Sequence, residues 1–175
     1  SFHPVKIITT GEGGMAVTND HELADKMSLL RSHGITRDEK LMTQVPDGPW
    51  YYEQVDLGFN FRMTDIQAAL GVSQLQRLSS YIEKRNEIAK IYNSSLKCLP
   101  ITLPYQHSDS ISAYHLYVIK LRLDVIAHLT HAEVFQALLD QGILVNMHYI
   151  PVHTQPYYQA MGFKSGDFPN AEEYY

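Results

Sequence analysis

The spacing of apolar residues predicts a first helix that follows a short strand. Residues 15–18 form an apolar run after a glycine-rich turn and are expected to be a short buried strand. Asn19 is expected to cap the helix, with Glu22 three positions later completing a capping box. The helix is expected to end at Gly34, because glycine is common just after a helix C-terminus. Its apolar stripe has the i, i+4, i+7 spacing of one helix face and consists of Leu23, Met27 and Leu30.

A second helical region is predicted from residue 65 onward. Thr64 and Gln67 have the spacing of a capping box, so a helix is expected to begin at Asp65. Apolar residues then recur at helical spacing, and this face is expected to be core or dimer interface. A break is expected at the two serines 79–80, followed by a helix over about 81–96 whose charged side chains face solvent.

The last part of the chain carries the pattern of a small α/β layer. Residues 100–104 are expected to be extended, and the alternation over 112–121 is typical of a strand. Thr130 and Glu133 form a third capping-box pattern and predict another helix. The apolar residues 143–145 are expected to form a short strand after that helix.

Residues 35–59 show no clear period and are predicted to form a long loop. Within it, the stretch 46–52 combines turn residues with large aromatic side chains. Loops of this length in compact domains are usually functional or disordered, and the aromatic residues argue against disorder. Two interpretations stay open: a loop that packs its own side chains, or one that lies over the active site of a neighbouring subunit.

Composition narrows the class of protein. The 175 residues are 45% hydrophobic, carry a net charge of −5 and include one cysteine, Cys98. This balance suits one or two globular units with a hydrophobic core and offers no basic cluster for nucleic acid. No apolar run approaches the roughly 20 residues of a membrane-spanning helix, so no membrane contact is expected. A single cysteine excludes an internal disulfide framework and fits a reducing, cytoplasmic compartment.

Lys6 is the first candidate for covalent chemistry. A lysine amine can form a Schiff base with an aldehyde, and the Ser1 hydroxyl could hold a phosphate of the same cofactor. The glycines at 11, 13 and 14 would let the backbone turn tightly or pass close to a ligand. By its spacing alone, however, the pattern is more often an exposed lysine before a glycine-rich hairpin.

The whole run S-F-H-P-V-K-x4-G-E-G-G-M at residues 1–15 is more specific than this spacing. It resembles the Schiff-base segment of the pyridoxal-phosphate sugar aminotransferases of the DegT/DnrJ/EryC1/StrS family. The resemblance implies that Lys6 binds pyridoxal 5'-phosphate (PLP) covalently and that Ser1 contacts the cofactor phosphate. It also implies the α/β fold of PLP-dependent transferases of fold type I, which is the aspartate aminotransferase-like fold.

A second motif, G-F-N-F-R-M-T-D-I-Q-A-A at residues 58–69, is similar to the segment with which this family crosses its dimer. On this resemblance Asn60 reaches the cofactor phosphate of the other subunit, so a homodimer with shared active sites is expected. Arg62 is expected to assist substrate binding through its charge. Without the resemblance, Asn60 would more often be a turn residue.

Residues 146–158, N-M-H-Y-I-P-V-H-T-Q-P-Y-Y, form the third motif. Its two histidines lie five residues apart, but no carboxylate or cysteine is near in sequence, so no metal site is expected. The stretch also fits an aromatic-rich packed loop. It closely resembles the family's small-domain segment that lines the sugar-nucleotide pocket. The resemblance makes His148, Tyr149 and His153 candidate substrate-binding residues through hydrogen bonding and stacking.

Together these resemblances cover the chain and imply the latter part of a longer enzyme. Residues 1–97 are expected to end the large cofactor domain and supply the linking helix, and 98–175 to form a truncated small α/β domain. The implied reaction moves an amino group from L-glutamate to C4 of a UDP-linked 4-keto-6-deoxy-N-acetylhexosamine, as in pseudaminic acid biosynthesis. Another keto-sugar nucleotide, or a non-catalytic role as a regulator or structural partner, stays open.

Overall fold

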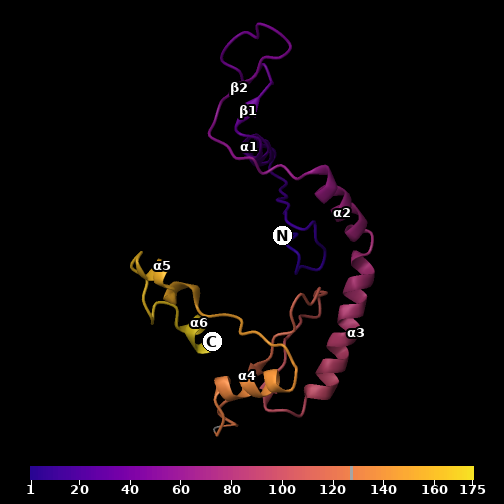
Figure 1. The fold of residues 1–175 in the computed structure, drawn as a ribbon, viewed down its shortest axis with the longest axis vertical. Coiled ribbons are helices and arrows are strands. Elements are labelled where there is room, and N and C mark those ends of the chain that lie inside the picture. The colour runs from indigo at the N-terminus through magenta and orange to yellow at the C-terminus, as the bar shows by residue number, and fades with distance from the viewer. Residues whose placement is uncertain (127) are drawn as a thin grey trace. The chain divides into compact units, whose positions relative to one another are not determined.

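The computed structural model describes residues 1–126 and 128–175, which form two compact units (Figure 1). The first unit is Ser1–Tyr81 and the second is Ile82–Tyr175. The expected domain division at residue 98 concerns the whole enzyme and stays a prediction. None of the helices in the described ranges combines the length and the apolar character that a membrane span needs.

Helix α1, His21–Arg31, is the first helix of the first unit and begins one residue later than predicted. Its N-cap is Asp20, whose Oδ1 accepts a hydrogen bond from the Leu23 amide at 3.1 Å. The prediction of Asn19 as the cap is therefore wrong. Aspartate supplies the capping oxygen together with a negative charge, which the positive end of the helix dipole favours.

The strands of the first unit are only two residues long. Strand β1, Ile35–Thr36, pairs antiparallel with β2, Glu53–Gln54. The strand predicted at residues 15–18 does not form, and the side chains of Met15 and Val17 are 73% and 83% exposed. An apolar run predicts a strand only where a neighbouring segment can pair with it, and no described strand does so here.

The loop between β1 and β2 closes on the side chain of Glu53. Its carboxylate accepts hydrogen bonds from the amides of Thr43 and Gln44, both at 2.8 Å, and from the Tyr51 hydroxyl at 3.2 Å. These bonds, led by the one from the Thr43 amide, lower the pKa of Glu53. The loop is held by its own residues, while Trp50 stays 67% exposed. A role over a neighbouring active site stays a prediction.

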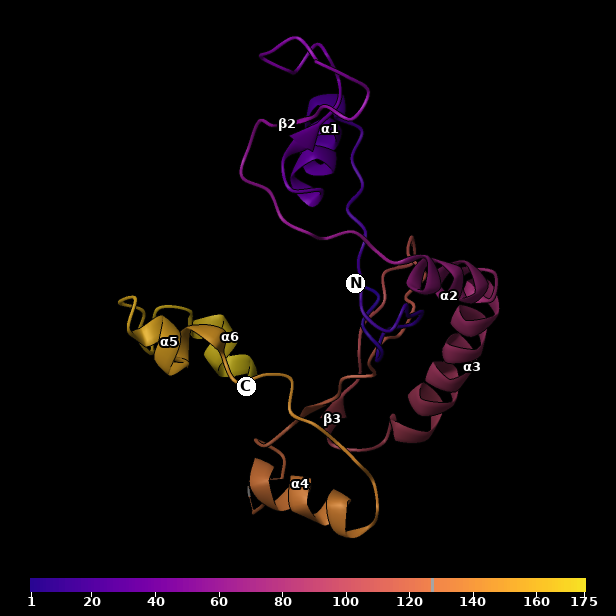
Figure 2. The same cartoon turned by 45° about the horizontal axis from the view of Figure 1, so that its top comes forward.

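Helix α2, Asp65–Leu75, is followed through a short turn by α3, Leu78–Leu96 (Figure 2). The break lies at Gln76, the C-cap of α2, and not at the two serines where it was predicted. Ser80 instead lies in the first turn of α3, and its hydroxyl donates to the Arg77 carbonyl at 2.9 Å. Serine is compatible with a helix start as well as with a break, which explains the displacement.

In the second unit, strand β3, Ile101–Thr102, pairs antiparallel with β4, Lys120–Leu121. The predicted extended segment around β3 is confirmed, but the strand predicted over 112–121 forms only at its end. Upstream of β4, the Asn86 side chain donates to the carbonyl of Ser112 at 2.9 Å. Arg85 likewise donates to the Tyr114 carbonyl at 2.8 Å, so side chains from α3 take carbonyls that a strand ladder would use.

The remaining elements of the second unit are helical. They are α4 (His131–Asp140), the 3-10 helix η1 (Val152–Thr154), α5 (Pro156–Gln159) and α6 (Pro169–Tyr174). Helices α5 and α6 lie near one another in both ribbon views (Figures 1 and 2). The strand predicted at 143–145 does not form. Two of the three predicted capping boxes are confirmed, that of Thr64 and Gln67 on α2 and that of Thr130 and Glu133 on α4.

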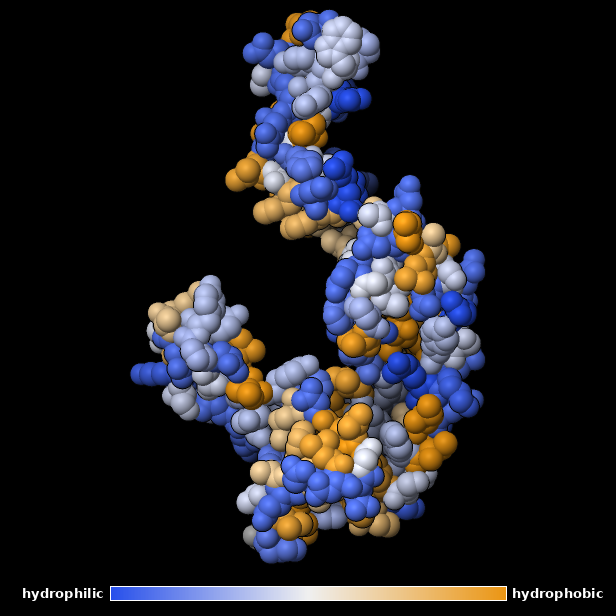
Figure 3. Space-filling model, in the orientation of Figure 1, coloured by the Kyte–Doolittle hydropathy of each residue, from blue (hydrophilic) through white to orange (hydrophobic). Residues whose placement is uncertain are grey.

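Few side chains are buried in the described parts of the chain. Ala89 is the buried hydrophobic residue, at 3% exposure, and none of the large side chains is fully buried. Three polar residues are also buried, namely Thr10, Thr36 and His153. Apolar residues therefore lie at the surface, where they are visible in Figure 3, and the face of α2 predicted to be core or interface is exposed at Ile66 and Leu75.

Candidate functional site

Lys6 lies on a loop whose ends are joined by the backbone of Phe2. The Phe2 amide donates to the Gly13 carbonyl at 2.8 Å, and the Thr10 amide donates to the Phe2 carbonyl at 3.0 Å. Between these closures, the Lys6 amide donates to the His3 carbonyl at 3.0 Å and forms a tight turn. The Lys6 side chain is half-buried at this turn. The motif at residues 1–15 therefore forms a closed loop that presents an amine.

This Lys6 loop, residues 2–13, is docked against the start of α2. The carbonyl of Glu12 accepts two hydrogen bonds, one from the Thr10 hydroxyl at 2.7 Å and one from Gln67 Nε2 at 3.1 Å. Thr10 is only 3% exposed, so it is the best buried polar residue of the loop. Two motifs that were recognised separately in the sequence thus contact each other in the first unit.

Two glycines allow this close approach. A Cβ on Gly71 of α2 would lie 2.8 Å from Thr10 Cγ2, closer than real Cβ contacts. A Cβ on Gly13 would lie 2.5 Å from Thr10 Oγ1 and 2.8 Å from Met63 Cε, and Gly13 has a φ of 151° that favours glycine. The loop therefore packs on α2 through positions that leave no room for a side chain.

The second set of predicted residues lies beside the end of α1. Asn60 forms a bridge with Ser32, and its Oδ1 accepts a hydrogen bond from Arg62 Nε at 3.1 Å. Arg62 Nη2 is also 3.5 Å from His33 Nε2. With its oxygen engaged by Arg62, the Asn60 amide has its Nδ2 group available as a donor. Asn60 and Arg62 are brought together as a polar pair on an exposed segment.

Ser1 lies at the start of the Lys6 loop and is exposed. Its Oγ accepts a hydrogen bond from the His3 amide at 3.4 Å, which leaves the hydroxyl proton free to be donated. Lys6, Ser1, Asn60 and Arg62 all belong to the first unit.

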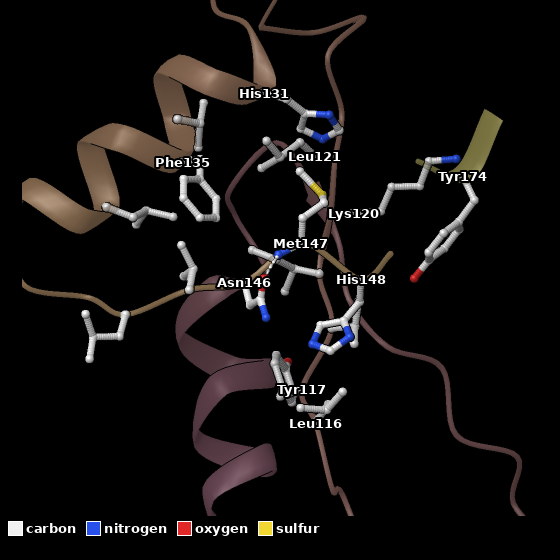
Figure 4. Close-up of a pocket in the computed structure, with 16 residues that line it drawn as sticks. Leu116, Tyr117, Lys120, Leu121, His131, Phe135, Asn146, Met147, His148 and Tyr174 are labelled. Carbon is white, nitrogen blue, oxygen red and sulfur yellow. Dashed lines mark hydrogen bonds between the residues drawn. The ribbon is translucent and has the colours of Figure 1, made fainter. Parts of the chain in front are cut away.

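The third motif lies in the second unit, where His148 lines a pocket of about 550 Å³ (Figure 4). The polar groups around this pocket include Lys120, His131 and Asn146, set among apolar residues of β4 and α4. The ring of Tyr149 meets that of His148 edge-on at 4.1 Å, and Tyr149 is 66% exposed. His148 is thus the candidate of this motif that faces a cavity.

His153 has a different environment from His148. It is 8% exposed, its Nε2 is 2.8 Å from Glu172 Oε1, and its ring lies 4.8 Å from that of Phe168. The Glu172 carboxylate also accepts from the Ser165 hydroxyl at 2.6 Å and the Gly166 amide at 2.7 Å. Hydrogen bonding to Ser165, then to His153 and Gly166, lowers the pKa of Glu172 to about 2. His153 therefore joins η1 to α6.

Two residues hold these sites together through contacts that the sequence does not signal. Gln67 is recognisable as a capping residue, but its bond to Glu12 joins positions 55 residues apart. Glu172 is 19 residues from His153 and is predicted by no motif. Such contacts depend on how the chain folds back on itself, so a pattern in the sequence cannot reveal them.

All 175 residues match the model of the DegT/DnrJ/EryC1/StrS aminotransferase family, and the chain belongs to this family. Among its relatives is the UDP-4-amino-4,6-dideoxy-N-acetyl-beta-L-altrosamine transaminase of Campylobacter jejuni. That enzyme is 39% identical over 92% of this chain and 40% of its own length. The predicted family is thereby confirmed.

Solved structures confirm the predicted fold class. Helicobacter pylori PseC, an aminotransferase involved in the biosynthesis of pseudoaminic acid, superposes with a TM-score of 0.82 at 35% identity, covering 100% of this chain and 44% of PseC. The putative sugar aminotransferase Spr1654 of Streptococcus pneumoniae, in its PMP form, gives a TM-score of 0.81 at 30% identity over 99% of this chain and 44% of its own. The chain thus spans under half the length of these relatives and forms part of a fold type I transferase.

Aminotransferases of this family depend on PLP, and Spr1654 has been solved in PLP and PMP forms. The donor set of the first unit has the chemistry that this cofactor needs. Lys6 offers a primary amine for an aldehyde, whereas Ser1 and Asn60 offer neutral donors for a phosphate. The residues present therefore fit PLP.

Proposed function

We propose that the whole protein is a transaminase that moves the amino group of L-glutamate to C4 of a UDP-linked 4-keto-6-deoxy-N-acetylhexosamine. The products are 2-oxoglutarate and the UDP-linked 4-amino-4,6-dideoxy sugar, so amine and carbonyl exchange between the two substrates. The observation that carries this proposal is the closed, docked loop that presents Lys6 within a family-wide match. Similarity to the Campylobacter transaminase and to PseC supports the substrate class. Another keto-sugar nucleotide is the alternative.

In this proposal the chain's residues bind and orient the cofactor and move one proton. PLP, when bound, supplies an aldehyde for the amine and a ring that accepts the electron pair of the broken C–H bond. Lys6 Nζ holds the cofactor and, once displaced by the amino donor, carries the proton from the substrate carbon. Ser1 Oγ and Asn60 Nδ2 donate to phosphate oxygens and so fix the orientation of the reacting carbon.

The proposal includes a cytoplasmic homodimer in which Asn60 serves the site of the other subunit. The hydrogen bond from Arg62 to Asn60 Oδ1 supports this role, because it turns the amide so that Nδ2 can donate. His148, Tyr149 and His153 are assigned to the sugar nucleotide together with Arg62. Among the three residues of the third motif, His148 has the better support, since it lines a pocket.

The test of Lys6 is borohydride reduction of the full-length protein with PLP, followed by peptide mass mapping. The reduced cofactor is expected on Lys6, and Lys6→Ala is expected to lose this adduct and at least about 1,000-fold in kcat, because the amine acts as both anchor and base. Lys84→Ala is the matched control: Lys84 is exposed on α3 and pairs with Glu87 at 2.8 Å, so adduct and turnover should persist. An unmodified Lys6 in a folded, PLP-saturated protein would favour the non-catalytic alternative.

The shared site is tested with mixed dimers of Asn60→Ala and Lys6→Ala subunits. Each variant alone is expected to be impaired, but a mixed dimer has one site with both residues intact. At equal subunit amounts half of the dimers are mixed, so about a quarter of the parent kcat is expected to return. Analytical ultracentrifugation verifies that the dimers form. Activity no higher than the mean of the two separate variants would refute a site built from two subunits.

A further inference from the structure

We propose that Gln67 is a positioning residue for Lys6, because its side-chain amide caps α2 and anchors the Lys6 loop at the same time. This inference rests on the proposed function in one respect, namely that Lys6 holds the cofactor. It assigns a functional role to a residue that the sequence pattern explains fully as a helix cap.

The hydrogen bonds of the amide fix its orientation. Gln67 Oε1 accepts from the Thr64 amide and from the Thr64 hydroxyl, both at 3.0 Å. A backbone N–H can only donate, so the oxygen must face Thr64 and the Nε2 group must face the other way. There Nε2 donates to the Glu12 carbonyl at 3.1 Å, and a carbonyl can only accept. A flipped amide would oppose donor to donor on one side and acceptor to acceptor on the other.

The anchored carbonyl is well placed to control the loop. Glu12 O accepts from Gln67 on α2 and from the buried Thr10 hydroxyl within the loop, so both of its lone pairs are used. The next residue, Gly13, and Thr10 itself carry the two backbone bonds to Phe2 that close the loop. The hydrogen bonds to the Glu12 carbonyl therefore stabilise the closed loop, and Lys6 lies between the two ends of that loop.

The contact is reinforced by packing on the same side of α2. Thr10 Cγ2 occupies the space that a Cβ on Gly71 would need, one helical turn after Gln67. The loop is thus held at α2 by a hydrogen bond at Gln67 and by a close approach at Gly71. A loop held at two points on a helix keeps its shape better than one tied only to itself, which is the requirement for a pre-oriented amine.

The two roles of Gln67 can be separated by one substitution. Glutamate serves as well as glutamine at this position of a capping box, so Gln67→Glu keeps the acceptors for Thr64. A carboxylate has no proton to donate to the Glu12 carbonyl, so the same change removes the anchor. Gln67→Ala removes both roles. Glu133→Gln is the matched control, because it makes the reverse exchange in the capping box of α4, in the second unit.

The experiment measures three quantities on the full-length protein: Tm, the Kd for PLP, and hydrogen exchange of residues 2–13 without cofactor. Gln67→Glu is expected to keep the Tm of the parent, to exchange faster in the loop and to bind PLP about tenfold more weakly, the effect of losing one hydrogen bond. Gln67→Ala is expected to show the same two changes and also a lower Tm, because it removes the cap of α2 as well. Glu133→Gln is expected to change neither exchange in the loop nor PLP binding.

Unchanged hydrogen exchange of residues 2–13 in Gln67→Glu would show that Gln67 does not anchor the Lys6 loop. Faster exchange with an unchanged Kd for PLP would show that the anchor does not position Lys6. Weaker PLP binding in Gln67→Ala alone would reduce Gln67 to a helix cap. Failure of the proposed function is recognised separately, by the absence of a Lys6 adduct in the parent protein after borohydride reduction.

Discussion

The two units organise their candidate residues in opposite ways. In Ser1–Tyr81, two motifs far apart in the sequence converge, because the Lys6 loop is bonded to α2 through Gln67. In Ile82–Tyr175, a single short motif is divided, because His148 lines a pocket while His153 is buried against Glu172. Nearness in the sequence is therefore a poor guide to which residues act together.

The chemistry of the two arrangements also differs. The Lys6 loop is fastened to α2 by neutral groups, namely a hydroxyl, an amide and a backbone carbonyl, and the pair of His3 Nε2 with Glu12 Oε1 at 3.7 Å joins two exposed side chains of the loop. The segment around His153 is fastened by one carboxylate that collects donors from a histidine, a serine and a backbone amide. Bonds to an ionised group are stronger than neutral ones but depend on its ionisation. The second unit should therefore be sensitive to acid where the Lys6 loop is not.

The largest change in hydrogen exchange is expected from acid or from Glu172→Gln, since each disturbs the three hydrogen bonds of the Glu172 carboxylate. The folded pKa of Glu172 is lowered to about 2 from 4.5, so its stabilisation is complete above pH 4.5 and is lost as the pH falls toward 2. Hydrogen exchange of residues 153–172 should therefore accelerate over that range while residues 2–13 stay protected. Glu172→Gln should exchange fast already at neutral pH.

Glu173→Gln on the same helix is the control for this comparison, because its exposed side chain makes no contact with His153 among the described residues. It should follow the parent at every pH. Equal acid sensitivity in residues 2–13 and 153–172 would contradict the distinction between a neutral and a charged fastening.

The fold was predictable where the signal is local. The pairs Thr64–Gln67 and Thr130–Glu133 cap their helices as predicted, because a capping box needs only residues three apart. Where two neighbouring residues can both cap a helix, the sequence does not decide between them. The cap of α1 was predicted at Asn19 but is Asp20 for that reason. The strand predictions were wrong where pairing depends on distant segments, or where side chains of α3 donate hydrogen bonds to the carbonyls that a strand would use.

The candidate site, like the fold, was predictable only where its signal is local in the sequence. Lys6 and Ser1 stand in one contiguous motif and were identified from it, and the family that this motif indicated is confirmed. Their roles stay predictions. Gln67 was visible only as a cap and Glu172 not at all, since their partners lie 55 and 19 residues away. Sequence patterns indicate which residues carry the chemistry, whereas the contacts that hold those residues appear only after folding.

The smallest effect, and the sharpest comparison of the units, comes from the two caps. Thr64→Ala and Thr130→Ala each remove a capping hydroxyl and should each destabilise by about 1 kcal/mol, as measured by urea unfolding. Their consequences for the Lys6 loop should differ. The Thr64 hydroxyl supplies one of the two hydrogen bonds to Gln67 Oε1, so its loss weakens the hold on the amide that donates to Glu12 and should speed hydrogen exchange in residues 2–13. Thr130 holds Glu133 alone, so Thr130→Ala should leave that exchange unchanged. Equal loop exchange at equal destabilisation would mean that the cap of α2 acts on its own helix only.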